Sequence, residues 1–299
     1  MRRVLIIVAL VVAAAALGLW RSHGSVRGGL SSALGIAKED QGEVRDEIRK
    51  SFQLQPGAQV EVQAINGSVE IQTSDTTTAD VYVLRTANSQ DALNSREIII
   101  EQTANGLTVR AQRSHNLGFF DRLFGHNPNE QVTIKAPRQI AIALKGVNGR
   151  VTTGDIDGSL EVNGINGRVE LGQASDSAEI NGVNGNVSVG FKQLQHGARV
   201  NGINGNVELR FASGANADLT ARGMNGRVRS DTADITVDRD DRGSRYSARI
   251  GNGGALIAIS GINGNVRLTR QMSGSSAGSG DKDDSGETKS SKRDLKGGA

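Results

Sequence analysis

The sequence predicts an all-β protein in which successive strands stack as a parallel β-helix-like solenoid. The main observation is a motif of an apolar residue, Asn, Gly, any residue and Val, which occurs seven times with its Asn at 66, 148, 166, 184, 204, 225 and 263. From the second copy onward the Asn residues are 18, 18, 20, 21 and 38 positions apart, which is a period of about 19 with one copy skipped. Such a constant period is typical of solenoids, whose repeats bury apolar side chains against one another.

The second observation is that apolar residues keep the same offsets from each Asn, at −6, −4, −1, +3 and usually +5. Alternation of this kind predicts strands on both sides of the motif, and its change of phase at Asn-Gly predicts a corner with positive φ. Asn-Gly is also a strong hairpin signal, so a meander of antiparallel hairpins is the alternative. The apolar phase favours the parallel stack because it places the residues before and after the corner in one interior. Two strands and two corners then make one coil of ~19 residues, about 4.8 Å from the next.

Stacking of equal coils aligns equal residues. The Asn side chains are therefore expected to form a hydrogen-bonded ladder from coil to coil, and the Val at +3 a continuous apolar stripe. The residue at +2 is polar in every copy and should face solvent: Ser68, Arg150, Arg168, Asn186, Asn206, Arg227 and Asn265.

The amino terminus predicts export. Arg2 and Arg3 precede an apolar run from Val4 to Trp20, which would span roughly 25 Å as a hydrophobic helix. Residues 1–20 are then either a cleaved signal peptide, for which Ala14-x-Ala16 offers a site, or a retained membrane anchor that ends at Trp20.

Residues 21–51 are predicted to be a Gly- and Ser-rich linker followed by a short charged helix over 36–51. The helix is suggested by Val44, Ile48 and Phe52, which are four residues apart. The solenoid domain is placed at 52–270, and 271–299 is predicted to be a disordered tail because it contains almost no apolar residue.

Within that domain, residues 52–109 and 132–144 alternate apolar and polar residues, with a break at Pro137, which predicts further strands. The skipped copy falls at 235–250. There two more strands are expected to fill the missing coil around a charged loop at 238–245.

Composition excludes several classes of function. There is no Cys, so disulfides, thiolate metal sites and Cys nucleophiles are absent. The formal net charge is only +3 and 3% of the residues are aromatic, which does not indicate nucleic-acid binding.

Several segments together resemble known families. Gly-Ile-Asn-Gly at 164–167, 202–205 and 261–264, Lys-Ala-Pro at 135–137 and Gln-Pro-Gly-Ala-Gln-Val-Glu-Val at 55–62 are similar to the bacterial putative-adhesin families of unknown function, including the "head GIN" and "toastrack" groups. The resemblance implies a single-stranded, right-handed β-helix-like domain outside the cytoplasmic membrane, and some relatives accompany envelope-stress sensing. It carries over no functional residue, because the matching positions are structural corners.

Few residues are candidates for catalysis or for metal binding. Asp155 and Asp157 in Gly-Asp-Ile-Asp-Gly, and the cluster of Asp238, Asp240 and Asp241, are the carboxylates that a polysaccharide-active enzyme or a cation site would use. The first pair is interpreted as a corner and the second as neutralised by interleaved Arg. The four His residues, at 23, 115, 126 and 196, lack metal-ligand spacing. No catalytic residue, metal or cofactor is predicted.

One predicted loop contains a cluster of large apolar residues. The segment between 113 and 130 contains Phe119, Phe120, Leu123 and Phe124. Apolar residues clustered on a loop indicate either a cap over an open end of the stack or a contact site for a partner or membrane surface.

The sequence therefore predicts a non-enzymatic, exported cell-envelope protein that serves as a scaffold for display, adhesion or interaction. Its partner would be a protein or polymer of the envelope, together with the membrane if residues 1–20 are retained. The alternatives are a membrane-anchored accessory of envelope-stress sensing and, third, a polysaccharide-active enzyme.

Overall fold

The computed structural model describes residues 43–114, 128–240 and 245–271 and is all-β, with one ten-stranded and one eleven-stranded sheet. The chain divides into two compact units. The described part of the smaller unit is 43–46, 85–96, 114 and 128–129. The larger unit contains Glu47–Leu84, Glu97–Arg113 and the described residues from Glu130 onward. The predicted segment 1–20 and almost all of the 271–299 tail lie outside the described residues.

In the part of the chain that the structure describes, the elements are strands and one short helix. They are β1 (Val44–Gln53), β2 (Gln59–Gln63), β3 (Gly67–Ser74), β4 (Thr78–Ala87), α3 (Gln90–Asn94), β5 (Arg96–Thr103), β6 (Gly106–Arg113), β7 (Asn129–Pro137), β8 (Ala141–Lys145), β9 (Val151–Thr153), β10 (Leu160–Asn166), β11 (Val169–Ala174), β12 (Ser177–Asn184), β13 (Val187–Phe191), β14 (Gly197–Asn204), β15 (Val207–Ala212), β16 (Ala217–Arg222), β17 (Val228–Ser230), β18 (Ile235–Arg239), β19 (Arg245–Ile250), β20 (Ala255–Asn263) and β21 (Val266–Gln271).

Each Asn-Gly motif joins one strand of the eleven-stranded sheet to one strand of the ten-stranded sheet, and we call such a pair of strands a rung. Neighbouring rungs pair in parallel with equal residues in register, for example Ile165 with Val183 and Val169 with Val187. This pairing excludes the antiparallel meander for the seven motif-bearing rungs.

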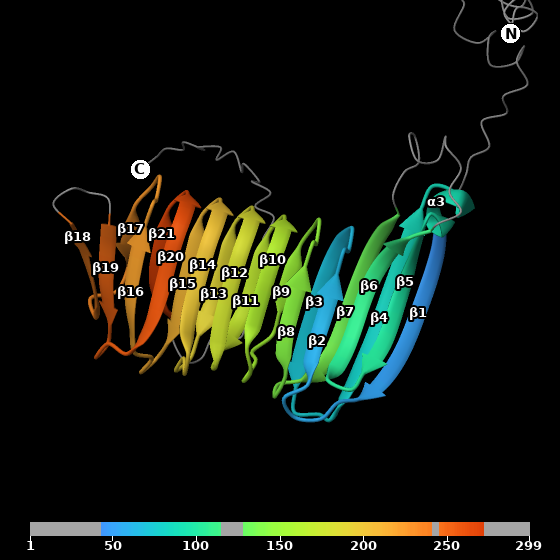
Figure 1. Cartoon of the computed structure of the whole chain (residues 1–299), viewed down its shortest axis with the longest axis horizontal. Helices are drawn as coiled ribbons and strands as arrows, with labels where there is room; N and C mark the ends of the chain where they lie inside the picture. Colours follow the sequence, from blue (N-terminus) through green and yellow to red (C-terminus); the bar gives the residue numbers. More distant parts are fainter. Residues whose placement is uncertain (1–42, 115–127, 241–244, 272–299) are drawn as a thin grey trace, which may run out of the picture. The chain divides into compact units, whose positions relative to one another are not determined.

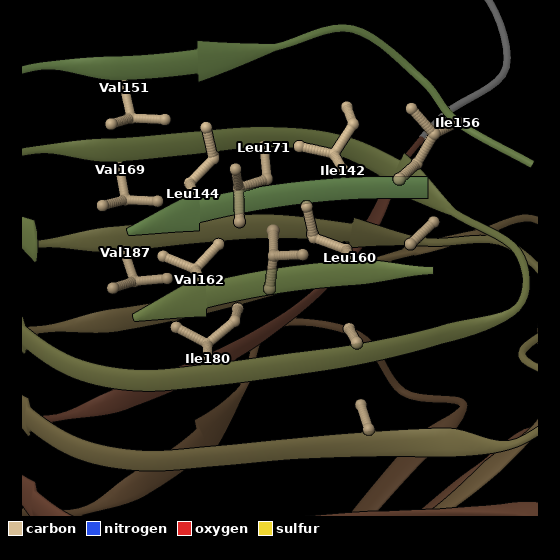
Figure 2. Close-up of a cluster of buried hydrophobic side chains, with 14 of the residues drawn as sticks. Ile142, Leu144, Val151, Ile156, Leu160, Val162, Val169, Leu171, Ile180 and Val187 are labelled. Carbon is tan, nitrogen blue, oxygen red and sulfur yellow. The ribbon is translucent and has the colours of Figure 1, made fainter. Parts of the chain in front are cut away.

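The core of the larger unit lies between the two sheets. Figure 2 shows Val151, Val169 and Val187 from the ten-stranded sheet facing Leu144 and Val162 from the other. All seven Val residues at +3 are buried, as the offsets predict. Burying aliphatic side chains of this size contributes about 1.5–3 kcal/mol each relative to exposure, so the repeated apolar offsets are the main source of stability.

The Asn side chains form the predicted ladder through all seven rungs. Each Nδ2 donates to the Oδ1 of the neighbouring Asn at 3.0–3.1 Å: Asn148 to Asn66, Asn166 to Asn148, Asn184 to Asn166, Asn204 to Asn184, Asn263 to Asn204 and Asn225 to Asn263. Because each of the five inner side chains both donates and accepts, their amides are satisfied at a corner where the backbone leaves one sheet for the other.

The order of this ladder corrects the prediction of a skipped coil. The rung of Asn263 lies between those of Asn204 and Asn225, since β20 and β21 pair on one side with β14 and β15 and on the other with β16 and β17 (Figure 1). Residues 235–250 do not fill a coil within the stack. They form β18 and β19, which pair antiparallel with each other and continue the eleven-stranded sheet beyond β16. The last motif of the chain, that of Asn263, thus forms the second-to-last rung, and the motif of Asn225 forms the last one. We call the rung of Asn263 the inserted rung.

The predicted helix over 36–51 is wrong from Val44 onward, where β1 begins. A spacing of four fits a helical turn, but four is also a multiple of the strand period of two, so Val44, Ile48 and Phe52 share one face of β1. Ile48 and Phe52 pack against the core of the larger unit. Residues 36–42 lie outside the described part of the chain.

The described part of the smaller unit is held around Arg85, whose guanidinium is buried. It donates to Asp46 Oδ2 at 2.8 Å and to the carbonyl oxygens of Leu93 and Arg96. Helix α3 begins after Ser89, whose hydroxyl accepts from the N–H of Ala92 at 3.1 Å. The sequence pattern did not predict this helix, because a single turn is too short to show a helical period.

Two glycine positions in each motif have different roles. At +1, the corners of neighbouring rungs approach so closely that a Cβ on Gly167 would lie 2.0 Å from the carbonyl oxygen of Gly149. At −2, the backbone is left-handed, with φ of 66° at Gly164, but a Cβ there would have 3.8 Å to its nearest neighbour. The first motif has Ala64 at −2 with φ of 56°, so a side chain can be accommodated at that position.

We predict that Gly164→Ala and Gly167→Ala differ sharply in unfolding free energy. Gly164→Ala should cost about 1 kcal/mol, the strain of a left-handed Ala. Gly167→Ala should cost about 3 kcal/mol or more, because its Cβ overlaps a backbone carbonyl that packing holds in place. Urea unfolding of the two variants measures the difference, and equal losses would contradict the assignment of close approach to the +1 position alone.

The inserted rung can be tested by cross-linking, since the chain contains no native Cys. Adjacent strands are about 4.8 Å apart, within the Cα separation that a disulfide spans. The double variants Asn204→Cys/Asn263→Cys and Asn225→Cys/Asn263→Cys should therefore oxidise to intramolecular disulfides. Asn204→Cys/Asn225→Cys should not, because two strand spacings separate these positions. Asn184→Cys/Asn204→Cys is the positive control, and rapid cross-linking of 204 with 225 would show that the rungs follow sequence order.

Candidate functional site

The candidate interaction residues Phe119, Phe120, Leu123 and Phe124 lie outside the described residues. Their assignment as a cap or a contact site stays a prediction.

Asp155 and Asp157 do not face a common site. The Oδ1 of Asp155 accepts from the backbone N–H of Gln173 at 2.7 Å, and Asp157 is 3.6 Å from the ammonium of Lys192. Each carboxylate has its own structural partner, so the pair belongs to a corner between strands, as the flanking glycines indicate.

In the second acidic cluster, the two described carboxylates are exposed or partly exposed. Asp240 accepts from the backbone N–H of Arg245 at 3.0 Å, Asp238 lies at the exposed end of β18, and Asp241 lies outside the described residues. Of the four His residues only His196 is described, and its Nδ1 is 2.5 Å from Asp176 Oδ1. Across 43–114, 128–240 and 245–271, no three His, Asp or Glu side chains are placed to hold a metal ion. In the same residues, no helix has the length and apolar character needed to cross a membrane.

The most distinctive surface is the outer face of the ten-stranded sheet in the larger unit. A shallow groove of ≈ 660 Å³ crosses β11, β13, β15 and β21 and is lined almost entirely by polar side chains. They stand at +2 and +4 from the motif Asn, which is the face opposite the Val core. The predicted solvent-facing character of the +2 residues is confirmed: six are exposed and Ser68 is partly exposed.

The order of rungs brings six of the +2 residues into one line, which we call the Arg/Asn row. In spatial order the row is Arg150, Arg168, Asn186, Asn206, Asn265 and Arg227. Three consecutive Asn residues are thus flanked by Arg at both ends. In the sequence Arg227 stands between Asn206 and Asn265, so the inserted rung is what makes the Asn residues contiguous.

The three Asn side chains of the row are oriented by the backbone. The Oδ1 of Asn186 accepts from the N–H of Asn206, that of Asn206 from the N–H of Asn265, and that of Asn265 from the N–H of Arg227, at 3.0–3.1 Å. One lone pair of each oxygen is used in this way, whereas no hydrogen bond with a described residue engages the three amide nitrogens. An amide nitrogen and a guanidinium group can only donate, so the row presents mainly N–H donors.

The acidic residues beside the row are occupied by neighbours. Glu170 is 3.6 Å from Arg168, and Glu208 accepts from the hydroxyl of Ser188 at 2.8 Å. By contrast, Arg150, Arg227 and Arg229 have no ion pair with any described residue. Arg229 lies directly beside Arg267, which pairs with Asp231. Unpaired positive charge therefore lies just beyond the residues that line the groove, at Arg150 on one side and at Arg227 and Arg229 on the other.

The opposite outer face is more balanced. Lys145 lies between two carboxylates, at 2.9 Å from Glu61 and 3.6 Å from Glu161. The hydrogen bond with Glu61 is the main cause that raises the pKa of Lys145. Burial tends to raise the pKa of Glu61, but its bonds with Lys145 and Gln63 outweigh this and lower it. In this cluster one Lys pairs with two Glu, which leaves a net charge of −1, so it offers no positive charge to an anionic ligand.

Two aspartates near the inserted rung, Asp218 and Asp234, bond residues that are distant in the sequence. The pKa of Asp218 is lowered by the N–H of Gly254, which bonds its Oδ2 at 3.0 Å, and by Arg249. The pKa of Asp234 is lowered by the hydrogen bond from Arg270 at 2.6 Å. Arg270 also donates to the carbonyl oxygens of Ala212 and Ala215, so it ties β21 to the neighbouring corner.

Comparison with known proteins gives structural matches alone. No family model matches the chain, and no curated protein matches it. A putative cell adhesion protein from Clostridium sporogenes is 10% identical, with 76% of this chain and 100% of that chain covered and a TM-score of 0.39. A putative adhesin from Bacteroides fragilis is 11% identical, with 76% and 97% covered and a TM-score of 0.27. Both are bacterial proteins whose descriptions name adhesion.

We predict that Asp218 and Asp234 stabilise the fold near neutral pH and lose this effect in acid. A folded-state pKa below the ordinary value of 3.8 favours the carboxylate form in the folded chain. The stabilisation is therefore present above that value and disappears as the pH falls through the lower folded pKa. The double variant Asp218→Asn/Asp234→Asn should be less stable than wild type at pH 7, and the gap should shrink at low pH. Asp238→Asn is the control for loss of one exposed carboxylate, and a gap that is constant with pH would contradict the assignment.

Proposed function

We propose that this protein is an exported cell-envelope scaffold, a β-solenoid of about 19 residues per right-handed coil that displays rows of equal side chains for adhesion or interaction. The observation that carries the proposal is the outer face of the ten-stranded sheet, where one side chain per rung repeats at a spacing of about 4.8 Å. A surface of this kind binds by many weak contacts along a partner, as multivalent binding requires.

A non-enzymatic role is supported by the way in which the candidate chemical groups are used. Asp155, Asp157 and Glu170 each bond a structural partner, and the Asn ladder is satisfied within itself. The groove is open and polar, whereas catalysis favours a water-excluding site with perturbed carboxylates.

Export is supported by the apolar run from Val4 to Trp20. The absence of Cys is compatible with export, since a stack of paired strands can be stable outside the cytoplasm without disulfides. The descriptions of the similar solved structures as adhesins are compatible with a surface location. In the proposed arrangement residues 1–20 direct the chain to the envelope, 21–42 act as a spacer, and the segment with Phe119, Phe120, Leu123 and Phe124 caps the stack or contacts a partner.

Export can be tested with the full chain in a bacterial host. The wild-type protein should be digested by protease added to spheroplasts, and Leu10→Arg should leave it protected in the cytoplasm. A charged residue at the centre of an apolar helix costs about 2.5–3.5 kcal/mol of insertion free energy. Leu30→Arg, in the spacer, is the matched control and should not change digestion. A wild-type protein that stays protected while a periplasmic marker is digested would refute the proposal.

The non-enzymatic part of the proposal has its own test. Purified full-length protein should remain bound to isolated envelope material through repeated washing and should release no new reducing ends from it. Release of soluble sugar that stops in Asp155→Asn/Asp157→Asn would instead identify a polysaccharide-active enzyme.

A further inference from the structure

The Arg/Asn row on the outer face of the ten-stranded sheet identifies a partner by its chemistry. Most of the hydrogen-bonding capacity of the row is N–H donation, because the Arg guanidinium groups can only donate and each of the three Asn oxygens already accepts from the backbone of the next rung. The ligand that satisfies such a row must present acceptors. Guanidinium groups at both ends further require that these acceptors include anions, since Arg matches the planar geometry of a carboxylate.

The length of the row indicates an extended ligand. From Arg168 to Arg227 there are four rung spacings, or about 19 Å along the sheet, and Arg150 adds one more. A ligand lying across the strands would meet one donor per rung, with Arg contacts at its two ends and amide contacts over Asn186, Asn206 and Asn265. The groove is shallow and open throughout, so it fits a chain rather than a small molecule that must be enclosed.

The net charge of its side chains distinguishes the outer face of the ten-stranded sheet from the outer face of the eleven-stranded sheet. At +2 and +4 of the seven rungs the ten-stranded sheet carries five Arg, at 150, 168, 227, 229 and 267, and three Glu, at 70, 170 and 208. The three Glu are engaged by Gln72, Arg168 and Ser188. At the matching outward positions −5 and −3 the eleven-stranded sheet has three acids, Glu61, Glu161 and Glu179, and three bases, Lys145, Arg199 and Arg222. Only the first face has an excess of positive charge.

We propose that the Arg/Asn row is a binding track for an acidic polysaccharide whose carboxylates pair with the terminal Arg residues and whose hydroxyl oxygens accept from the Asn amides. This inference rests on the proposed envelope location, where such polymers would be met. A protein partner fits less well, since the groove has no Trp, Tyr or Phe to anchor an interface. Single-stranded nucleic acid also fits less well, because its binding uses aromatic stacking that the groove lacks.

The test uses the full-length protein and immobilised alginate, a polymer of uronic acids. Wild type should bind alginate and not dextran, its neutral counterpart, and binding should weaken with salt as exposed charges are screened. The triple variant Arg150→Gln/Arg168→Gln/Arg227→Gln should bind about tenfold more weakly, on the basis of roughly 0.5 kcal/mol for each exposed charge contact. The matched control is Arg199→Gln/Arg222→Gln/Arg245→Gln, which removes three charges from the other sheet and should change affinity less than twofold.

A second pair of variants tests the Asn residues without removing an Arg. Asn206→Asp keeps an oxygen that accepts from the N–H of Asn265, so the stack is retained, but it replaces a donor by an acceptor. Asn201→Asp adds the same charge within β14, at an exposed position on the outer face of the other sheet, whereas Asn206 lies in the corner between β14 and β15. Asn206→Asp should weaken alginate binding and Asn201→Asp should not, with both variants unchanged in circular dichroism.

Several results would overturn the track: equal binding to dextran, tighter binding to single-stranded DNA of matched charge, equal losses from the two triple variants, or no alginate binding at all. These outcomes are distinct from failure of the proposed function. A protein that is exported but ignores alginate refutes the track alone, and one that binds alginate through the row but stays in the cytoplasm refutes the envelope role alone.

Discussion

The close approach of one Asn-Gly corner to the next is the constraint on which the larger unit depends. The +1 position takes glycine because it packs directly on the carbonyl of the neighbouring rung, as Gly167 does on Gly149. That contact brings the adjacent Asn side chains within hydrogen-bond distance and holds the following Val residues in one buried column. Strand pairing, the amide ladder and the apolar core are therefore three results of the same spacing, and a change at the corner affects all of them together.

The repetition explains which features could be predicted from the sequence. Burial at +3, exposure at +2 and the Asn ladder depend only on equal residues meeting in register, so any neighbour with the same motif gives the same result. The identity of the neighbour is a different matter. The strand ending at Asn204 can pair with the motif of Asn225 or with that of Asn263, because both offer the same corner and, apart from one position, the same apolar offsets. The two motifs differ at +5, which is Ser230 in the first and Leu268 in the second. The period alone does not show which of them lies next to Asn204, and the order of rungs was mispredicted for that reason.

Ambiguity of period accounts for the other difference. Val44, Ile48 and Phe52 are compatible with a helix and with a strand. In the strand Asp46 and Lys50 lie on the same face, where Asp46 pairs with Arg85. The segment is a strand because it pairs with β4 at the edge of the ten-stranded sheet. The candidate site shows the same limit. The polar character of the +2 residues was evident, but the contiguous Asn186, Asn206 and Asn265 arise only through the inserted rung, which also leaves Arg residues at both ends.

The inserted rung has a further consequence for how the chain is made. During synthesis β16 and β17 leave the ribosome before β20 and β21, which are their parallel neighbours in the two sheets. The same two later strands also pair with β14 and β15, so they lie between strands that were all made before them. If β16 and β17 were to pair first with β14 and β15, that contact would have to open before the native order could form.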